Sequence, residues 1–252
     1  MGAAETLMLL GWVAVATYAQ TITGFAFGLL MMGGVVLTGL IPIALVAILI
    51  SILSFFNAVM ALYRKMGNID REIVLLCSLS GAFTMVAGVW VLDVLSGHYV
   101  HWLQLILGVA ILLSSLTLVL RPLPSRYRAS RTSFLFFGAL SGLMGGMFAS
   151  SGPPLVFHFY RQPLGLKVIR DCLLLIFAIN GFQRLALVGL QGKLDMQIFW
   201  LAAMSMPVVM LFTFLGRRYP PRLSGSNLRR VAFVLLFLSG ASLCVSALVS
   251  VV

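Results

Sequence analysis

Three polar side chains lie within one apolar run in the second half of the chain. Asn180, Gln183 and Arg184 are three and four positions apart, so a helix brings them to one face. An arginine inside a membrane helix costs about 2.5–3.5 kcal/mol on insertion scales. Because a guanidinium beside two amides donates bidentate hydrogen bonds, this face predicts a site for a small oxyanion. The alternative is an arginine that snorkels to the interface or pairs with a helix C-terminus.

A break in the helical pattern precedes this run. The segment Ser150-Ser151-Gly152-Pro153-Pro154 carries two adjacent prolines, which cannot lie inside a continuous helix. We expect one helix to end near Ala149 and another to start at Pro153. Such a start exposes backbone N–H groups and the positive end of a helix dipole. The break therefore predicts a small anion site formed by Ser150, Ser151, Gly152 and Pro153.

A second, weaker break lies in the first half of the chain. The segment Thr21-Ile-Thr23-Gly24 interrupts an apolar run that begins at Thr6. In lipid, irregular backbone is tolerated only where protein buries it or where it lines a cavity. Thr23 and Gly24 are therefore candidates for ligand contact. Hydroxyl groups at this position could equally satisfy the backbone groups that the break leaves free.

The third candidate region is a polar face on the helix that follows. Asn57 lies there with Ser51 and Ser54. An amide on this face could contact the ligand. It could also join neighbouring helices, which is a frequent role of Asn and Ser in membranes.

Composition restricts the class of protein. The chain has 252 residues, of which 61% are hydrophobic and only 9% are charged, and its mean hydropathy is +1.10. This predicts an all-α, polytopic membrane protein, because a soluble domain needs more charge on its surface. The apolar runs are too long for an outer-membrane barrel. Although the net charge is +11, the basic residues cluster in short loops, which indicates membrane orientation and not nucleic-acid binding.

The sequence offers no constellation for catalysis or for a metal. The three cysteines lie singly in apolar runs, and the three histidines form no ligand motif. We therefore expect a protein that is not an enzyme and has no cofactor. His158, just after the second break, could couple transport to protons or could be a packed imidazole.

The order of apolar runs predicts two similar halves. The expected helices are Thr6–Gln20, Leu29–Leu37, Ile43–Tyr63, Ile73–Leu95, Val100–Leu120, Phe134–Ala149, Pro153–Tyr160, Asp171–Leu190, Met196–Leu215 and Leu228–Val252. Residues 1–120 form the first half, 121–132 a polar linker and 133–252 the second half. Gly67-Asn-Ile-Asp70 corresponds to Gly192-Lys-Leu-Asp195, where each aspartate is expected to cap a helix.

Charge determines the expected orientation of the halves. Loops 64–72, 121–132, 161–170 and 217–230 hold three, four, three and five Lys or Arg residues, which places them in the cytoplasm. Residues 93–101, residues 191–195 and both termini are then outside. Each half becomes a broken, re-entrant helix pair followed by three spans, so the second half is inverted relative to the first. Inverted repeats with broken helices are typical of secondary transporters.

The two glycine-rich breaks carry a resemblance to a known family. Gly142-Leu-Met-Gly-Gly-Met-Phe-Ala-Ser-Ser-Gly-Pro-Pro-Leu-Val156, followed by a helix with Arg184, resembles the second repeat of the TauE/SafE-type sulfite exporters. Thr23-Gly-Phe-Ala-Phe-Gly-Leu29 is similar to the first-repeat motif of that family. The chain departs from the family pattern at Met31-Met-Gly-Gly-Val35, where a proline often follows the glycines.

The resemblance implies a transporter of small sulfur oxyanions or organosulfonates in the cytoplasmic membrane. An inside-negative potential of 100 mV drives each negative charge outward with about 2.3 kcal/mol, so export needs no coupling ion, although a coupled proton or sodium ion is compatible with it. The alternatives are transport of another small anion such as a carboxylate, a membrane enzyme, or an assembly subunit. A homo-oligomer is compatible with each of these.

Overall fold

The described part of the chain folds into helices joined by short turns and irregular segments. The computed structural model describes residues 2–38, 41–63, 68–98 and 126–219, together with scattered positions within 102–116 and 237–244. Within these ranges there is no β-strand. The spans expected at Val100–Leu120 and Leu228–Val252, and the linker segment 121–125, lie outside the described residues or are described only at scattered positions.

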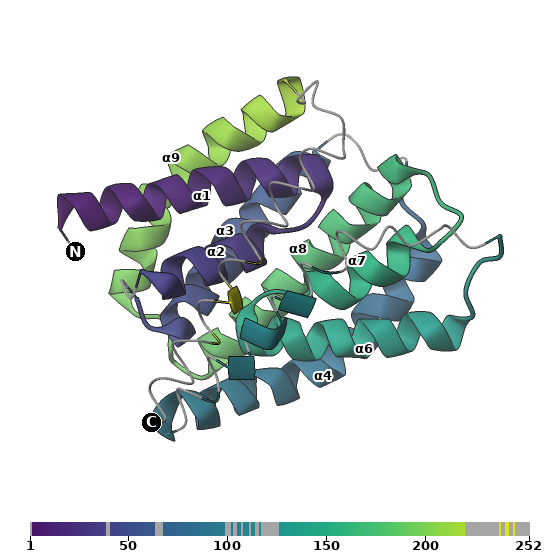
Figure 1. Ribbon diagram of the computed structural model, residues 1–252, viewed down its shortest axis with the longest axis horizontal. Coiled ribbons are helices and arrows are strands. Elements are labelled where there is room, and N and C mark those ends of the chain that lie inside the picture. Colours follow the sequence, from purple (N-terminus) through teal and green to yellow (C-terminus); the bar gives the residue numbers. More distant parts are fainter. Residues whose placement is uncertain are drawn as a thin grey trace.

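Eight helices are described along the full length of their elements, and five of them are long and apolar enough to cross a membrane: α1, α3, α4, α8 and α9. Their bounds, which can be followed in Figure 1, are α1 Ala3–Thr23, α2 Phe27–Leu37, α3 Ile43–Leu62, α4 Arg71–His98, α6 Arg131–Phe148, α7 Gly152–Tyr160, α8 Leu166–Leu190 and α9 Met196–Arg218.

The two breaks lie close to the predicted positions, with small differences that have local causes. Helix α1 continues beyond Gln20 to Thr23, and in this last turn the Thr21 and Thr23 hydroxyls donate to carbonyls one turn earlier, at 2.8 and 2.7 Å. Helix α7 begins at Gly152, so both prolines lie in its first turn, where their missing N–H groups cost no helical hydrogen bond. The expected helix breaks are thus present in the structure.

Both helices that precede a break end in the same way. Gly24 follows α1 with φ of 84°, and Ala149 follows α6 with φ of 51°. Each is in the left-handed region, and its N–H donates to the carbonyl four residues earlier, as in an αL cap. This conformation turns the chain sharply, so the next short helix folds back instead of continuing the first.

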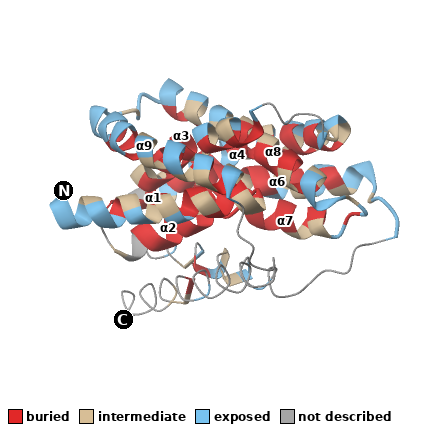
Figure 2. Cartoon of the chain, turned by 90° about the horizontal axis from the view of Figure 1, so that it is seen from above, coloured by how far each residue is buried: buried red, intermediate tan, exposed pale blue. Residues whose placement is uncertain are grey.

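Helices α3 and α8 form the centre of the bundle, and two outer pairs flank them. Figure 1 shows α1 beside α9 along one edge and α4 beside α6 along the other. Buried residues, red in Figure 2, concentrate where these layers meet. The α3–α8 pair is antiparallel, because Ser51 meets Arg184 while Leu62, further along α3, clusters with Leu174, earlier in α8.

The α4–α6 pair is closely packed through small residues. A Cβ atom added at Gly138, Gly142 or Gly146 would collide with the backbone of α4 near Cys77, Gly81 and Met85. Close backbone approach of this kind is the usual way in which membrane helices pack without a hydrophobic driving force. Helices α4 and α6 run in the same direction, since later residues of α6 meet later residues of α4.

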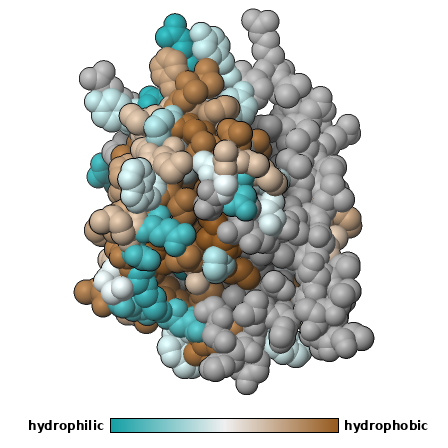
Figure 3. Space-filling model, turned by 90° about the vertical axis from the view of Figure 1, so that its left-hand side faces the viewer, coloured by the Kyte–Doolittle hydropathy of each residue, from teal (hydrophilic) through white to brown (hydrophobic). Residues whose placement is uncertain are grey.

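Charged side chains gather at the two ends of the bundle. At one end, Asp93 of α4 pairs with Lys193 in the turn between α8 and α9. At the other, Glu72 pairs with Arg128 and Arg131 at 3.0 and 2.8 Å. Between these ends the surface exposes large apolar side chains such as Phe83, and Figure 3 shows hydrophobic residues exposed on one face. Such a surface suits contact with lipid.

Candidate functional site

The two helix breaks face one another in the middle of the bundle. A Cβ atom added at Gly28, in the first turn of α2, would lie 2.7 Å from the carbonyl oxygen of Ala149 and 3.0 Å from Cβ of Ser150. Glycine is required at position 28 because any side chain would separate the two breaks. The sequence predicts each break separately, whereas their contact is a property of the tertiary structure.

A small cavity lies where the breaks meet. Its volume is about 30 Å³, which is room for about two water molecules or a compact anion. Both breaks, the middle of α3 and the middle of α8 contribute to its wall. The described lining residues are Gln20, Phe25, Ala26, Phe27, Gly28, Ser51, Ser54, Met85, Gly145, Ala149, Ser150, Ser151, Gly152, Phe177, Asn180, Gly181 and Arg184.

Arg184 provides the charge of this cavity. Its side chain is only 2% exposed, so it does not reach the membrane interface. Nε donates to the carbonyl oxygen of Gly146 at 3.1 Å, and Nη1 donates to Oγ of Ser51 at 3.2 Å. None of the ion pairs within the described part of the chain includes Arg184. A buried guanidinium that two neutral acceptors hold in place, without a carboxylate, is suited to bind an anion.

Hydrogen bonds also hold the second break in its irregular shape. Ser141 of α6 donates through Oγ to the carbonyl oxygen of Ser151 at 2.8 Å, and Asn180 of α8 donates through Nδ2 to Oγ of Ser151 at 3.0 Å. A side chain at Gly145 would occupy the position of the same hydroxyl. The break is therefore anchored to both neighbouring helices, with the N-terminus of α7 at the cavity.

Five of the ten predicted site residues line the cavity together. These are Ser150, Ser151, Gly152, Asn180 and Arg184. Gln183 does not line it, although it is three positions from Asn180. Residues 183 and 184 are about 100° apart around a helix axis, so a face that points Arg184 inward turns its neighbour aside.

The other four predicted residues lie near the breaks or in a separate cluster. The Thr23 hydroxyl donates to the carbonyl oxygens of Ala19 and Phe25, and Gly24 packs against the backbone of Arg170. Pro153 is buried in the first turn of α7. Asn57 faces away from the cavity lining.

Asn57 instead joins three helices. Its Nδ2 donates to Oγ1 of Thr21 in α1 at 2.8 Å and to Oγ1 of Thr213 in α9 at 2.7 Å. Both hydroxyls donate in turn to backbone carbonyls one turn earlier. This arrangement matches the alternative interpretation of Asn57, that of a polar contact between helices.

The first half contributes polar residues that were not among the predicted site residues. Ser51 accepts the hydrogen bond from Arg184, and Ser54 is within 3.2 Å of both polar atoms of the Gln20 amide. All three line the cavity. The sequence already groups Ser51 and Ser54 with Asn57 on one polar face of α3, although only Asn57 was predicted to contact the ligand. Their orientation toward Arg184, and away from Asn57, depends on the crossing of α3 and α8.

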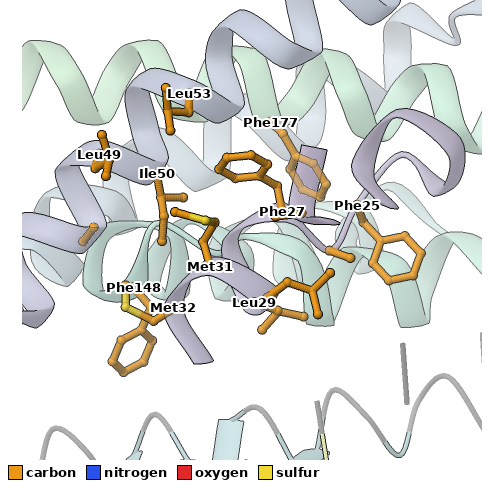
Figure 4. Close-up of a cluster of buried hydrophobic side chains, with 14 of the residues drawn as sticks. Phe25, Phe27, Leu29, Met31, Met32, Leu49, Ile50, Leu53, Phe148 and Phe177 are labelled. Atoms are coloured by element: carbon orange, nitrogen blue, oxygen red, sulfur yellow. The ribbon is translucent and has the colours of Figure 1, made fainter. Parts of the chain in front are cut away.

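Apolar side chains close the cavity on the remaining sides. Phe27 of α2 and Phe177 of α8 both line it, and they are neighbours in the buried cluster of Figure 4. His158 packs between aromatic rings instead, with centroids 4.3 Å from Phe137 and 4.7 Å from Phe134. Among the described residues, no group of three His, Cys, Asp or Glu side chains lies close enough to hold a metal.

Comparison with known proteins identifies the family. The family model for the sulfite exporter TauE/SafE matches residues 8–243. The chain belongs to the TauE/SafE sulfite exporter family. The resemblance seen in the two breaks is therefore confirmed. Members of this family are transporters and not enzymes, and the helices described above are those of a multi-pass membrane protein.

A curated relative supports the same assignment. A protein of Cupriavidus necator named "Probable sulfite/organosulfonate exporter TauE" is 41% identical over 251 residues, which cover 98% of each chain. No solved structure matches this TauE/SafE chain at a significant level.

Proposed function

We propose that the protein is a secondary transporter that exports small sulfur oxyanions or organosulfonates across the cytoplasmic membrane. The observation that carries the proposal is the position of Arg184. A buried cation that forms no ion pair within the described part of the chain lines a cavity between two broken helices, and one of these presents its N-terminus there. The name of the Cupriavidus necator relative supports the same substrate class.

We infer further that residues 1–120 and 133–252 are inverted repeats. Three pairs of corresponding helix ends are each 125 positions apart: Thr23 and Phe148, Phe27 and Gly152, and Arg71 and Met196. Under this correspondence α1, α3 and α4 of the first half match α6, α8 and α9 of the second half. The contact between α4 and α6 then corresponds to the contact between α9 and α1, and the contact between α3 and α9 corresponds to the contact between α8 and α4. The corresponding helices α3 and α8 run antiparallel, as inversion requires.

Sidedness follows from the charges at the two ends. The end with Arg128 and Arg131 is proposed to face the cytoplasm, and the end with Asp93 and Lys193 to face outward. After replacement of the three native cysteines, an impermeant thiol reagent should label Lys193→Cys in intact cells. It should label Arg126→Cys only after permeabilisation. Labelling of position 126 in intact cells would contradict the inverted arrangement.

Export is the direction that the membrane potential favours. Each negative charge gains about 2.3 kcal/mol per 100 mV on leaving an inside-negative cell, so uniport suffices. Coupling to a proton or a sodium ion is compatible with this proposal. A test for it is efflux from liposomes in the presence and absence of a proton or sodium gradient.

Reconstitution of the purified protein tests the function directly. Liposomes loaded with sulfite or methanesulfonate should lose either anion through the protein, and an inside-negative potassium diffusion potential should accelerate the loss. Acetate, as a small carboxylate, should move more slowly, since it presents two oxygens to the site instead of three. Preferred movement of acetate would favour the carboxylate alternative. A membrane enzyme or an assembly subunit would carry none of these anions.

A further inference from the structure

The cavity contains a buried hydrogen-bond acceptor that the protein leaves unused. Asn180 is 5% exposed, and its Nδ2 donates a hydrogen bond to the hydroxyl oxygen of Ser151. Its Oδ1 atom is buried and has no hydrogen-bond partner within the described part of the chain. A buried unsatisfied carbonyl is costly, so such an atom on a residue that lines a cavity is a candidate to accept a hydrogen bond from a ligand. Asn180 is one of the residues that line the anion cavity.

An unpaired acceptor is unfavourable beside a fully deprotonated anion. Two oxygens that both carry negative charge repel one another, and neither supplies a proton. An anion that keeps one hydroxyl group can instead donate to Oδ1 while its other oxygens accept from the Arg184 guanidinium and from backbone N–H groups. The wall thus combines donors and one acceptor.

The charge of the residues that line the cavity also favours an anion with a single negative charge. Among the described residues that line the cavity, Arg184 on α8 is the only charged one; α3, α4, α6, α7 and the first break contribute none. The carboxylate of Asp93 on α4 is paired with Lys193 at the end of the bundle. One fixed positive charge neutralises one negative charge, and a second negative charge would be buried without compensation.

We propose that the cavity selects singly charged oxyanions, and that sulfite is carried as hydrogen sulfite, HO–SO₂⁻, with its hydroxyl donating to Oδ1 of Asn180. This inference rests on the proposed function and narrows it. Organosulfonates, R–SO₃⁻, are singly charged as well, so they meet the same charge limit, but they lack a hydroxyl and leave Oδ1 of Asn180 unpaired. Sulfate, which is doubly charged near neutral pH, is excluded by charge and not by size.

The test uses the wild-type protein in liposomes at a fixed membrane potential and a series of pH values. The second pKa of sulfurous acid lies near neutrality, so the hydrogen sulfite fraction falls about tenfold per pH unit above it. Sulfite flux at constant total sulfite should fall in the same proportion. Methanesulfonate keeps a single charge throughout, so its flux should stay constant and control for titration of the protein. Sulfate flux should be about 100-fold lower than methanesulfonate flux.

Two outcomes would overturn the inference while leaving the proposed function intact. One is sulfite flux that stays level or rises as the dianion replaces hydrogen sulfite. The other is sulfate flux equal to that of methanesulfonate. If neither sulfite nor methanesulfonate moves at any pH, the proposed function itself fails and the inference falls with it.

A matched pair of variants tests the role of Asn180. At a pH where hydrogen sulfite dominates, Asn180→Leu should lower the affinity for hydrogen sulfite about tenfold relative to methanesulfonate, which has no hydroxyl to donate. Asn57→Leu removes the same kind of residue, also with an unpartnered Oδ1, from outside the cavity. It should leave the ratio of the two affinities unchanged. An unchanged ratio in Asn180→Leu would show that Oδ1 does not contact the ligand.

Discussion

Two buried asparagines lie in helices of this protein that are long and apolar enough to cross a membrane, in very different surroundings. Asn57 and Asn180 each donate through Nδ2 to hydroxyl groups, and each has an Oδ1 atom without a partner among the described residues. Asn57 is enclosed by the threonines of α1 and α9, whereas Asn180 shares an open cavity with the guanidinium of Arg184. A polar residue in a membrane helix therefore indicates a binding site only where charge and space accompany it.

Removal of the charge should have the largest effect. Arg184→Ala is expected to weaken anion binding by about 2–5 kcal/mol and to abolish measurable transport, because the cavity loses its only described cation. Arg184→Lys should retain part of the activity, since an ammonium lacks the planar fork that holds an oxyanion. Calorimetric titration with sulfite, on protein shown to be monodisperse, measures anion binding by both variants, and efflux from liposomes measures their transport. Normal transport by the alanine variant would place the site elsewhere.

Two glycine substitutions should have the next largest effects, one on anion binding and the other on helix packing. Gly152→Val should weaken anion binding with little loss of stability, because a Cβ atom there meets only the Phe177 ring, at 3.9 Å, while the side chain enters the cavity. Gly142→Val should instead destabilise the fold by about 1–3 kcal/mol, because it collides with the backbone of Gly81. Thermal unfolding and anion titration on both variants distinguish these outcomes. Unchanged affinity in Gly152→Val would show that the break is only a kink.

Substitution of Asn57 should lower the stability of the protein and leave its affinity for anions unchanged, the reverse of a substitution in the cavity. Asn57→Ala is expected to lower the free energy of unfolding by about 1–2 kcal/mol, since it removes hydrogen bonds to Thr21 and Thr213. Its affinity for sulfite should equal that of the wild-type protein. A tenfold loss of affinity without loss of stability would remove the distinction between the two asparagines.

The smallest effects are expected at the serines of the second break. Ser150→Ala and Ser151→Ala should each weaken binding by about 0.5–1.5 kcal/mol, the range for one hydrogen bond. Of the two, Ser151→Ala should also reduce stability, because its hydroxyl accepts from Asn180. The same titrations suffice, with Gln183→Ala as a control that leaves the cavity lining intact. Equal effects of Ser151→Ala and Gln183→Ala would mean that the break does not take part in binding.

Much of the fold could be predicted from local chemistry. The length and apolarity of the runs predicted the spans, and the prolines and glycines predicted both breaks within a few residues of their observed positions. Helical spacing placed Asn180 and Arg184 on one face, and both residues line the cavity. It also placed Gln183 there, because a sequence pattern describes a broad stripe, whereas the crossing of α3 and α8 selects a narrow part of it.

The sequence by itself therefore determined which segments are helical, where the backbone must break and that a charged residue, Arg184, lies inside an apolar run. These properties follow from hydrophobicity, proline and glycine geometry and the cost of burying an arginine, all of which act over a few residues. Only the tertiary structure decided that Gly28 touches the opposite break and that Ser51 supports Arg184. It also decided that Asn57 belongs to another cluster. These pairings join residues on different helices, from 36 to more than 100 positions apart, so the packing of whole helices selects them.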